Sequence, residues 1–322
     1  MTLSPAVLRR SVATSRWTAP YLPSLLVAAF SGALAWYGWS ALGTAQLVSV
    51  IHAGQVRYAG PVVLAVVAVT FAAERVWPAQ RRRVLACGHL ADVGYLVLYA
   101  SVTLPVSTLI GAGFATALSR HASWLTLPAY PAVPSWAFVV IGLVAIDATD
   151  WLVHFLNHRF NPLWRFHAVH HSQEEVSVLT TFRAHPLVHL SFAFTALPGF
   201  VLAANGATPV TLLTAYACLG AVPHANVPWT YGPVGRLIIS PAYHRAHHRA
   251  AGRTDVNLGV VFPFWDELSG RAIRPVPGGE VIATGLAGRP IPVEQERLVE
   301  QERPACSLPG LVATQLVEPF RR

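Results

Sequence analysis

Charged side chains are scarce in this sequence. Of its 322 residues, 12% are charged and 53% are hydrophobic, whereas roughly 25% of the residues of a typical soluble domain are charged. This composition excludes an ordinary soluble protein and is typical of a chain that crosses a membrane several times. We therefore expect one membrane domain, with polar residues in its loops and tails.

Cysteine is almost absent as well. Cys87, Cys218 and Cys306 are far apart and form no CxxC motif. They supply neither a disulfide framework nor a thiolate metal site. The sequence also has no glycine-rich nucleotide loop and no domain-scale repeat. These absences exclude a disulfide scaffold, a cysteine zinc site and a nucleotide-binding fold.

The net charge of +8 comes from short basic clusters rather than from one polar face. Arg9, Arg10 and Arg16 precede the first apolar segment, and the run 81–83 follows the second. Such clusters are typical of the cytoplasmic ends of membrane helices. They do not form the basic stripe of a nucleic-acid-binding protein, so no nucleic-acid partner is expected.

Four apolar segments are long enough to cross a hydrocarbon core about 30 Å thick. They lie near residues 21–41, 61–77, 92–118 and 135–156, and two shorter ones lie near 190–204 and 208–223. The short pair is separated by the turn signal NGATP. The first segment lacks a clean cleavage site and is expected to be a retained helix rather than a signal peptide.

The sequence thus predicts an all-α fold: an integral membrane helical bundle of about four transmembrane helices plus a short apolar hairpin. A cytosolic, helical, histidine-rich cap is expected to complete it. Both termini and the histidines are predicted to lie on the cytoplasmic side. The expected divisions are a cytosolic segment 1–20, transmembrane helices 21–134, a histidine-bearing domain 135–271 and a cytosolic tail 272–322 without visible chemistry.

Eleven of the fourteen histidines lie between His154 and His248. His154 and His158 form an HxxxH motif, and two HxxHH motifs follow: His167, His170 and His171, then His244, His247 and His248. Residues i, i+3 and i+4 of a helix share a face, so each motif directs its imidazoles to one point. Because clustered imidazoles repel once protonated, metal or neutral burial must hold them, and the spacing is that of metal ligands.

Eight nitrogen ligands are too many for one ion that keeps an open position, and they fit two ions with about four ligands each. Imidazole suits iron, zinc, copper or nickel, so the ligand type leaves the metal open. Asp147 lies inside the fourth apolar segment, where an ionisable group is usually functional, and it is a candidate for orienting the rings. Asp150, Glu174 and Glu175 are either further such candidates or solvated loop charges and helix caps.

Three stretches carry a resemblance to a known family: DWLVHFLNHRFNPLWRFHAVHHSQEEVSVLTTFRAHP, then HANVPW, then SPAYHRAHHRAAGRTDVNLGVVFPFWDELSG. Together they resemble the fatty acid hydroxylase and sterol desaturase superfamily of membrane di-iron oxygenases. The resemblance implies that residues 135–271 are a di-iron catalytic domain that uses two iron ions and dioxygen to hydroxylate or desaturate a lipid C–H bond. It implies metal-ligand roles for the eight motif histidines and for His224. For His185 it leaves a ligand role and a structural role open.

The resemblance also implies an external electron donor, because no flavin or nicotinamide motif, iron–sulfur cysteine set or fused haem domain is apparent. A ferredoxin or cytochrome b5 type protein with its reductase fits this requirement. Arg245, Arg249 and Arg253 are candidates either for docking an acidic donor or for contacting lipid phosphate. The alternative function is a histidine-rich membrane metal transporter or metal-binding protein, although a transporter would hold its ligands near the bilayer midplane.

Overall fold

We analysed a computed structural model, which describes residues 53–81, 86–125, 134–196, 198, 208–275, 282–286 and 308–320. This part of the chain is built of helices and loops, and within it the only β pairing is an isolated bridge between Arg249 and Thr284. The predicted helical fold is thereby confirmed for the described residues. The expected first membrane helix, 21–41, and the N-terminal segment 1–20 lie outside them.

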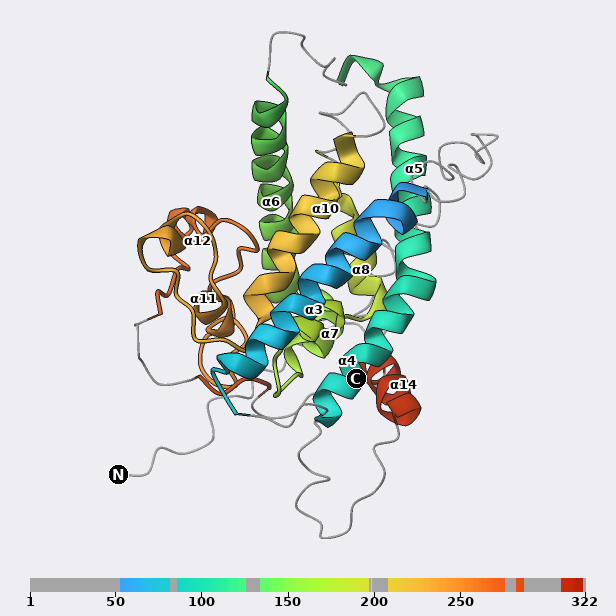
Figure 1. Cartoon of the computed structure of the whole chain (residues 1–322). Coiled ribbons are helices and arrows are strands. Elements are labelled where there is room, and N and C mark those ends of the chain that lie inside the picture. Colours follow the sequence, from blue (N-terminus) through green and yellow to red (C-terminus); the bar gives the residue numbers. More distant parts are fainter. Residues whose placement is uncertain are drawn as a thin grey trace, which may run out of the picture.

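Three of the predicted membrane segments are present as helices long and apolar enough to cross a bilayer: Arg57–Val76, Gly88–Leu118 and Val139–Arg159. The first contains α3 (Gly60–Val76) and the last lies within α6 (Ser135–Arg159). A shorter apolar helix, α10 (Thr208–Ala221), packs against both α3 and α6. These helices form the bundle in Figure 1. The side of the membrane on which each end lies stays a prediction.

The second of these spans is one long helical path. It consists of α4 (Cys87–Leu98), a π-helical turn (Tyr99–Thr103) and α5 (Leu104–His121). The π-helical turn ends two residues before Pro105, whose missing N–H interrupts regular α-helical hydrogen bonding. The interruption therefore changes the winding of this helix and does not divide the span into two pieces.

The chain turns sharply at the end of α6, and this turn begins the histidine-bearing region. Phe160 has an extended backbone (φ −110°, ψ 116°) and separates α6 from α7 (Asn161–His171). Pro162 lies in the first turn of α7, where its missing N–H has no helical acceptor to lose. The region continues through the 3-10 turn η5 (Val178–Phe182), α8 (Pro186–Phe192) and the 3-10 turn η6 (Ala193–Ala196). Most of the turn of the predicted apolar hairpin, residues 205–207, lies outside the described residues.

Residues 222–275 form a lobe beside α6 (Figure 1). Short elements joined by loops make up this lobe: the 3-10 turns η7 (Val222–His224) and η8 (Gly232–Arg236) and the helices α11 (Pro241–Arg245) and α12 (Phe264–Leu268). Asn257 is buried and ties the loops together, because its side chain donates to Tyr243 O and Ile273 O (both 2.8 Å). Side-chain hydrogen bonds to backbone groups therefore help to hold the loops of the lobe together.

The described parts of the tail pack against the rest of the protein. Helix α14 (Leu308–Val317) lies beside α4 (Figure 1). The Tyr95 hydroxyl on α4 donates to Gln315 Oε1 (3.0 Å). Nearer the lobe, Gly285 N donates to His248 O (3.2 Å), in the third histidine motif. These segments of the tail therefore contact α4 and the third histidine motif, whereas the expected division of the chain into domains stays a prediction.

Candidate metal centre

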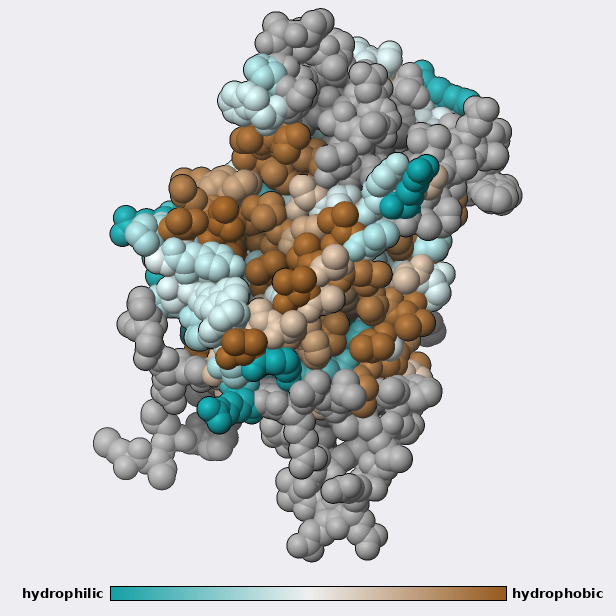
Figure 2. Space-filling view, viewed as in Figure 1, coloured by the Kyte–Doolittle hydropathy of each residue, from teal (hydrophilic) through white to brown (hydrophobic). Residues whose placement is uncertain are grey.

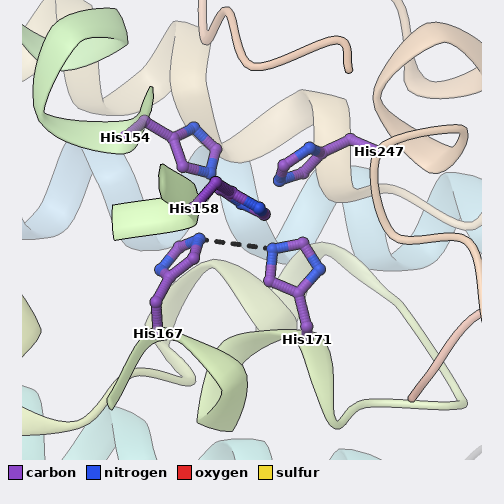
Figure 3. Close-up of side chains that lie close together, drawn as sticks. All are labelled: His154, His158, His167, His171 and His247. Carbon is purple, nitrogen blue, oxygen red and sulfur yellow. Dashed lines mark hydrogen bonds between the residues drawn. The ribbon is translucent and has the colours of Figure 1, made fainter. Parts of the chain in front are cut away.

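Nine histidines from four parts of the chain meet at the end of α6. They form two groups, and within each group the candidate ligand nitrogens lie within 4.8 Å of one another. The first group is His154, His158, His167, His171 and His247, shown in Figure 3; the second is His170, His224, His244 and His248. The groups are neighbours, because the rings of His171 and His248 stack with centroids 4.6 Å apart.

Each HxxHH motif contributes to both groups. In α7, His167 and His171 belong to the first group and His170 to the second. In α11 and the turn that follows it the assignment is reversed, since His244 and His248 belong to the second group and His247 to the first. Residues i and i+4 of a helix point in nearly the same direction, whereas i+3 is rotated away by about a quarter of a turn from i+4. The spacing HxxHH thus connects two neighbouring sites.

The ring nitrogens of the second group are spaced as the ligands of one ion. His224 Nε2 lies 3.2 Å from His170 Nε2 and 3.1 Å from His244 Nε2, which lies 3.2 Å from His248 Nε2. Ligands bound about 2.1 Å from a metal ion in a tetrahedron or octahedron are about 3.0–3.4 Å apart. A neutral imidazole has one donor and one acceptor nitrogen, so such a converging set suits a cation better than hydrogen bonds alone.

Burial keeps these imidazoles neutral, which is the form that binds metal. His171, His247 and His248 have no exposed surface. Desolvation lowers the pKa of His170 to about 4 and that of His171 and His247 well below the ordinary value. The Nε2 atoms of His158 and His247 are buried without a hydrogen-bond partner. Such atoms are costly unless a ligand satisfies them, and the donor set fits two nitrogen-bound metal ions.

Backbone carbonyls orient three of the rings. His154 Nδ1 lies 2.8 Å from Leu258 O, and His247 Nδ1 lies 2.9 Å from Val256 O. His170 Nδ1 lies 3.0 Å from the carbonyl oxygen of Arg183. A ring that donates through Nδ1 keeps its proton there and leaves the Nε2 lone pair for a metal.

The Asp147 carboxylate binds groups of the lobe and has no histidine among its described contacts. Its carboxylate accepts from Val261 N (2.9 Å), Phe262 N (3.0 Å) and Trp265 Nε1 (3.1 Å). These groups belong to α12 and to the loop before it, which begins at Leu258, the partner of His154. Asp147 thus holds the loop whose Leu258 carbonyl meets the His154 ring, and its expected role in orienting a metal ligand stays a prediction.

The other acidic candidates have separate partners. Asp150 is buried and accepts a hydrogen bond from Tyr216. Glu175 accepts from Gly88 N (3.0 Å) and so caps the first turn of α4. The Glu174 carbonyl accepts from the Thr284 hydroxyl (2.7 Å). Glu175 therefore has a capping role and Glu174 a connecting role in these contacts.

A buried carboxylate that the sequence analysis did not select fixes the same loop. Asp266 accepts from Leu258 N (2.9 Å), Gly259 N (3.0 Å) and Trp151 Nε1 (2.9 Å). Gly259 has little space, because a Cβ atom there would come within 2.7 Å of Phe262 O. Asp266 therefore holds the Leu258 carbonyl where His154 meets it. Asp266 lies in the stretch FWDEL, where no metal-ligand spacing marks it in the sequence.

Asp92 and Arg183 form a fully buried ion pair behind the second group, also missed from the sequence. Arg183 Nη1 lies 2.9 Å from Asp92 Oδ1, and both side chains have no exposed surface. Asp92 also accepts from Gln173 Nε2 (2.8 Å) and the Thr180 hydroxyl (2.9 Å). Because the Arg183 carbonyl contacts His170, this pair fixes the backbone that orients a candidate ligand.

Glu74 has a comparable role near His224. Its Oε1 accepts from Asn226 N (3.0 Å) and Val178 N (2.7 Å). The Asn226 side chain in turn accepts from Arg245 Nη2 (2.9 Å). Glu74 lies near the end of an apolar segment and 152 residues before Asn226, so only the folded chain reveals this contact.

His185, His189 and Arg245 lie away from both groups or are not exposed. His185 is hydrogen-bonded at both ring nitrogens, with Nε2 3.1 Å from Leu316 O and Nδ1 accepting from Leu187 N (3.1 Å). His189 packs on the Tyr99 ring. Arg245 is buried, so the hypothesis that it docks an electron donor is wrong for this residue.

We expect acid to destabilise the metal-free protein. The pKa of His170 is about 4 in the fold and about 6.5 in an unfolded chain. The unfolded state therefore takes up more protons as the pH falls from about 6.5 toward 4, and folding stability is lost over that range. Thermal unfolding of metal-stripped protein in detergent should show a lower melting temperature at pH 5 than at pH 7.5. Equal melting temperatures would contradict the neutral burial described above.

Comparison with known proteins gives an independent view of this region. The sequence model of the fatty acid hydroxylase family matches residues 139–271. The chain is 31% identical to the ornithine lipid hydroxylase OlsE of Rhizobium tropici over 153 residues, which are 47% of this chain and 46% of that protein. It is 27% identical to the alkylglycerol monooxygenase of Caenorhabditis elegans, over 38% of this chain and 24% of that protein. It is also 27% identical to the alkylglycerol monooxygenase of Homo sapiens, over 42% of this chain and 30% of that protein.

The chain spans less than half the length of these curated relatives. No solved structure matches it. The matched range nevertheless contains all nine grouped histidines and both carboxylates, Asp147 and Asp266, that hold the loop beside His154. Residues 139–271 therefore match the fatty acid hydroxylase family and are similar to lipid hydroxylases and monooxygenases over this region.

Proposed function

We propose that this protein is a membrane-bound di-iron enzyme that hydroxylates a lipid. The observation that carries this proposal is the meeting of nine mostly buried histidines in two adjacent groups at the end of a helix that can span a membrane. Two sites made almost entirely of imidazole suit a pair of redox-active metal ions. The family relationship favours iron and dioxygen.

In this proposal the two groups have parallel roles. His154, His158, His167, His171 and His247 hold one ion, and His170, His224, His244 and His248 hold the other. Bound iron supplies the redox chemistry that lets dioxygen oxidise an unactivated C–H bond, which no side chain can do. The protein contributes burial, which excludes water, and the carbonyl groups that hold ring protons on Nδ1. His185 is left out of the ligand set because both of its ring nitrogens have other partners.

The substrate is proposed to be a membrane lipid. Helix α6 carries His154 and His158 at one end and exposes apolar side chains along its length, such as Val140, Ile141 and Leu152. A lipid chain in the bilayer can therefore approach the metal centre along α6. The named activities of the relatives, on an ornithine lipid and on alkylglycerols, favour a lipid with a polar head and hydroxylation over desaturation.

The proposed enzyme needs two electrons for each dioxygen consumed, and we expect an external carrier with its reductase to deliver them. Arg249 and Arg253 remain candidates for contacting an acidic carrier, and Arg253 is exposed. A metal transporter is the weaker alternative, because the nine histidines lie at the end of α6 and in the segments that follow it. Ligands of a transported ion are expected near the middle of the span.

The test combines metal analysis with lipid analysis. Protein expressed in iron-supplied cells and purified in detergent should contain about two iron ions per chain, consistent with two ligand groups. Lipid extracts from cells with the protein should contain a species with one added oxygen atom that is missing from cells with an inactive variant. Product formation by a protein that holds one metal ion, or none, would contradict the di-iron proposal. Two irons without any oxidised lipid would contradict the assigned activity.

A further inference from the structure

The lobe beside α6 exposes large apolar side chains that the metal centre does not use. Leu268, at the end of α12, is 80% exposed, and Leu237, just after η8, is 68% exposed. Val234 and Ile238 are exposed beside Leu237. Single exposed apolar residues are ordinary, whereas neighbouring ones on one surface mark a contact with lipid or protein.

Arg274 shows that these residues belong to one surface. Its guanidinium donates to Gly235 O in η8 (3.1 Å) and forms an ion pair with Glu267 in α12. The two short elements are therefore bridged by a single side chain. We call residues 232–239 and 264–268 together the apolar edge.

The lobe reaches a part of α6 that lies within the candidate membrane span. Val261 N and Phe262 N donate to Asp147, which is seven residues before His154 in the sequence. At about 1.5 Å per residue, Asp147 lies about 10 Å farther along the helix than His154, toward the middle of the span 139–159. The lobe thus extends beside the membrane helix and not only beyond its end.

Both parts of the apolar edge lie beside the contact between Asp147 and the amides of Val261 and Phe262. Ile239 N donates to Val261 O (2.9 Å), which places the end of η8 next to the loop bound by Asp147. Trp151 Nε1 on α6 donates to Asp266 in α12 (2.9 Å). The elements that carry the exposed leucines therefore lie beside the part of α6 that belongs to the candidate span.

The backbone of the loop is suited to this depth. Non-helical segments are tolerated beside hydrocarbon only where their polar groups have partners in the protein. Asp147 accepts two of the loop amides, and Asp266 accepts those of Leu258 and Gly259. These buried carboxylates replace the water that would otherwise solvate the loop, which explains an acidic residue inside an apolar helix.

We propose that the apolar edge is immersed in the lipid bilayer, at the boundary between the headgroups and the acyl chains. Apolar surfaces of interfacial elements typically lie about 5–10 Å into this boundary. Figure 2 shows apolar surface continuing from α6 onto the adjoining side of the lobe. The exposed Arg236 and the Arg274 pair with Glu267 extend to the headgroup level. The proposal does not depend on the chemistry at the metal centre.

The test places a reporter on the edge of the full-length protein in phospholipid nanodiscs. Leu268→Cys and Leu237→Cys are made separately and labelled with an environment-sensitive nitrobenzoxadiazole dye. The background replaces Cys87, Cys218 and Cys306 with alanine. Both dyes should emit at shorter wavelength than in water and be quenched by phosphatidylcholine that carries a shallow doxyl group.

Arg253→Cys is the matched control, since Arg253 is exposed in the lobe and forms an ion pair only with Asp255 among its described contacts. We expect quenching at positions 237 and 268 to be several-fold greater than at 253. Equal quenching at all three positions would overturn the proposal. A dye shielded from water but not quenched by lipid would overturn it too, because this outcome indicates contact with protein. Monodisperse elution and unchanged helical circular dichroism verify that each variant is folded.

Discussion

Replacing His170 with asparagine is expected to remove iron from the protein and to abolish lipid oxidation. His170 Nε2 lies 3.2 Å from His224 Nε2, among four imidazoles that share one group. Loss of residues that merely orient a metal ligand typically costs 10–100-fold in affinity or activity, so loss of a ligand should cost at least about 100-fold. Iron content and oxidised lipid, measured on the same preparation, check this expectation.

His185→Asn is the matched control for His170→Asn. His185 is buried and lies in the same region, but its ring nitrogens meet Leu316 O and Leu187 N rather than other imidazoles. We expect this variant to keep its iron and most of its activity, with a lower melting temperature at most. If both substitutions removed iron equally, the assignment of His170 to the metal centre and of His185 to a structural role would be wrong.

The sequence predicted the parts of this protein that depend on local periodicity. Apolar runs locate α3, α6 and α10, because a membrane helix requires a continuous run of apolar residues. The motifs HxxxH and HxxHH located eight of the nine grouped histidines, since i, i+3 and i+4 lie on one side of a helix. The ninth, His224, has no such spacing, and only the resemblance of HANV to a known family indicated it.

The sequence did not predict the groups that support the histidines. Asp92 meets Arg183 across 91 residues of chain, and Glu74 meets Asn226 across 152. No periodic pattern joins such residues, because their meeting is determined by helix packing. The division of each HxxHH motif between two groups also depends on that packing. Local pattern therefore identified the candidate ligands, whereas the tertiary structure determines how they are grouped and oriented.

Replacing Arg183 with methionine is expected to cause the largest loss of stability among single changes outside the two histidine groups. Arg183 and Asp92 have no exposed surface, so the substitution leaves a buried carboxylate without its cation. Breaking a buried ion pair in this way costs about 3–5 kcal/mol. The Arg183 carbonyl also contacts His170 Nδ1, so movement of this backbone should lower iron retention. Thermal unfolding in detergent and iron content after dialysis measure the two effects.

Two further variants separate the ion pair from general disturbance of the fold. Arg253→Met breaks an ion pair of similar geometry, with Nε 3.0 Å from Asp255 Oδ1, but this pair is exposed to water. Because solvent screens such a pair, little change in melting temperature is expected. The double variant Asp92→Leu, Arg183→Met removes both buried charges and should recover much of the stability that Arg183→Met loses. Recovery of stability without recovery of iron would show that the pair also positions His170. If the double variant were as unstable as Arg183→Met, the uncompensated charge of Asp92 would not be the cause of the lost stability.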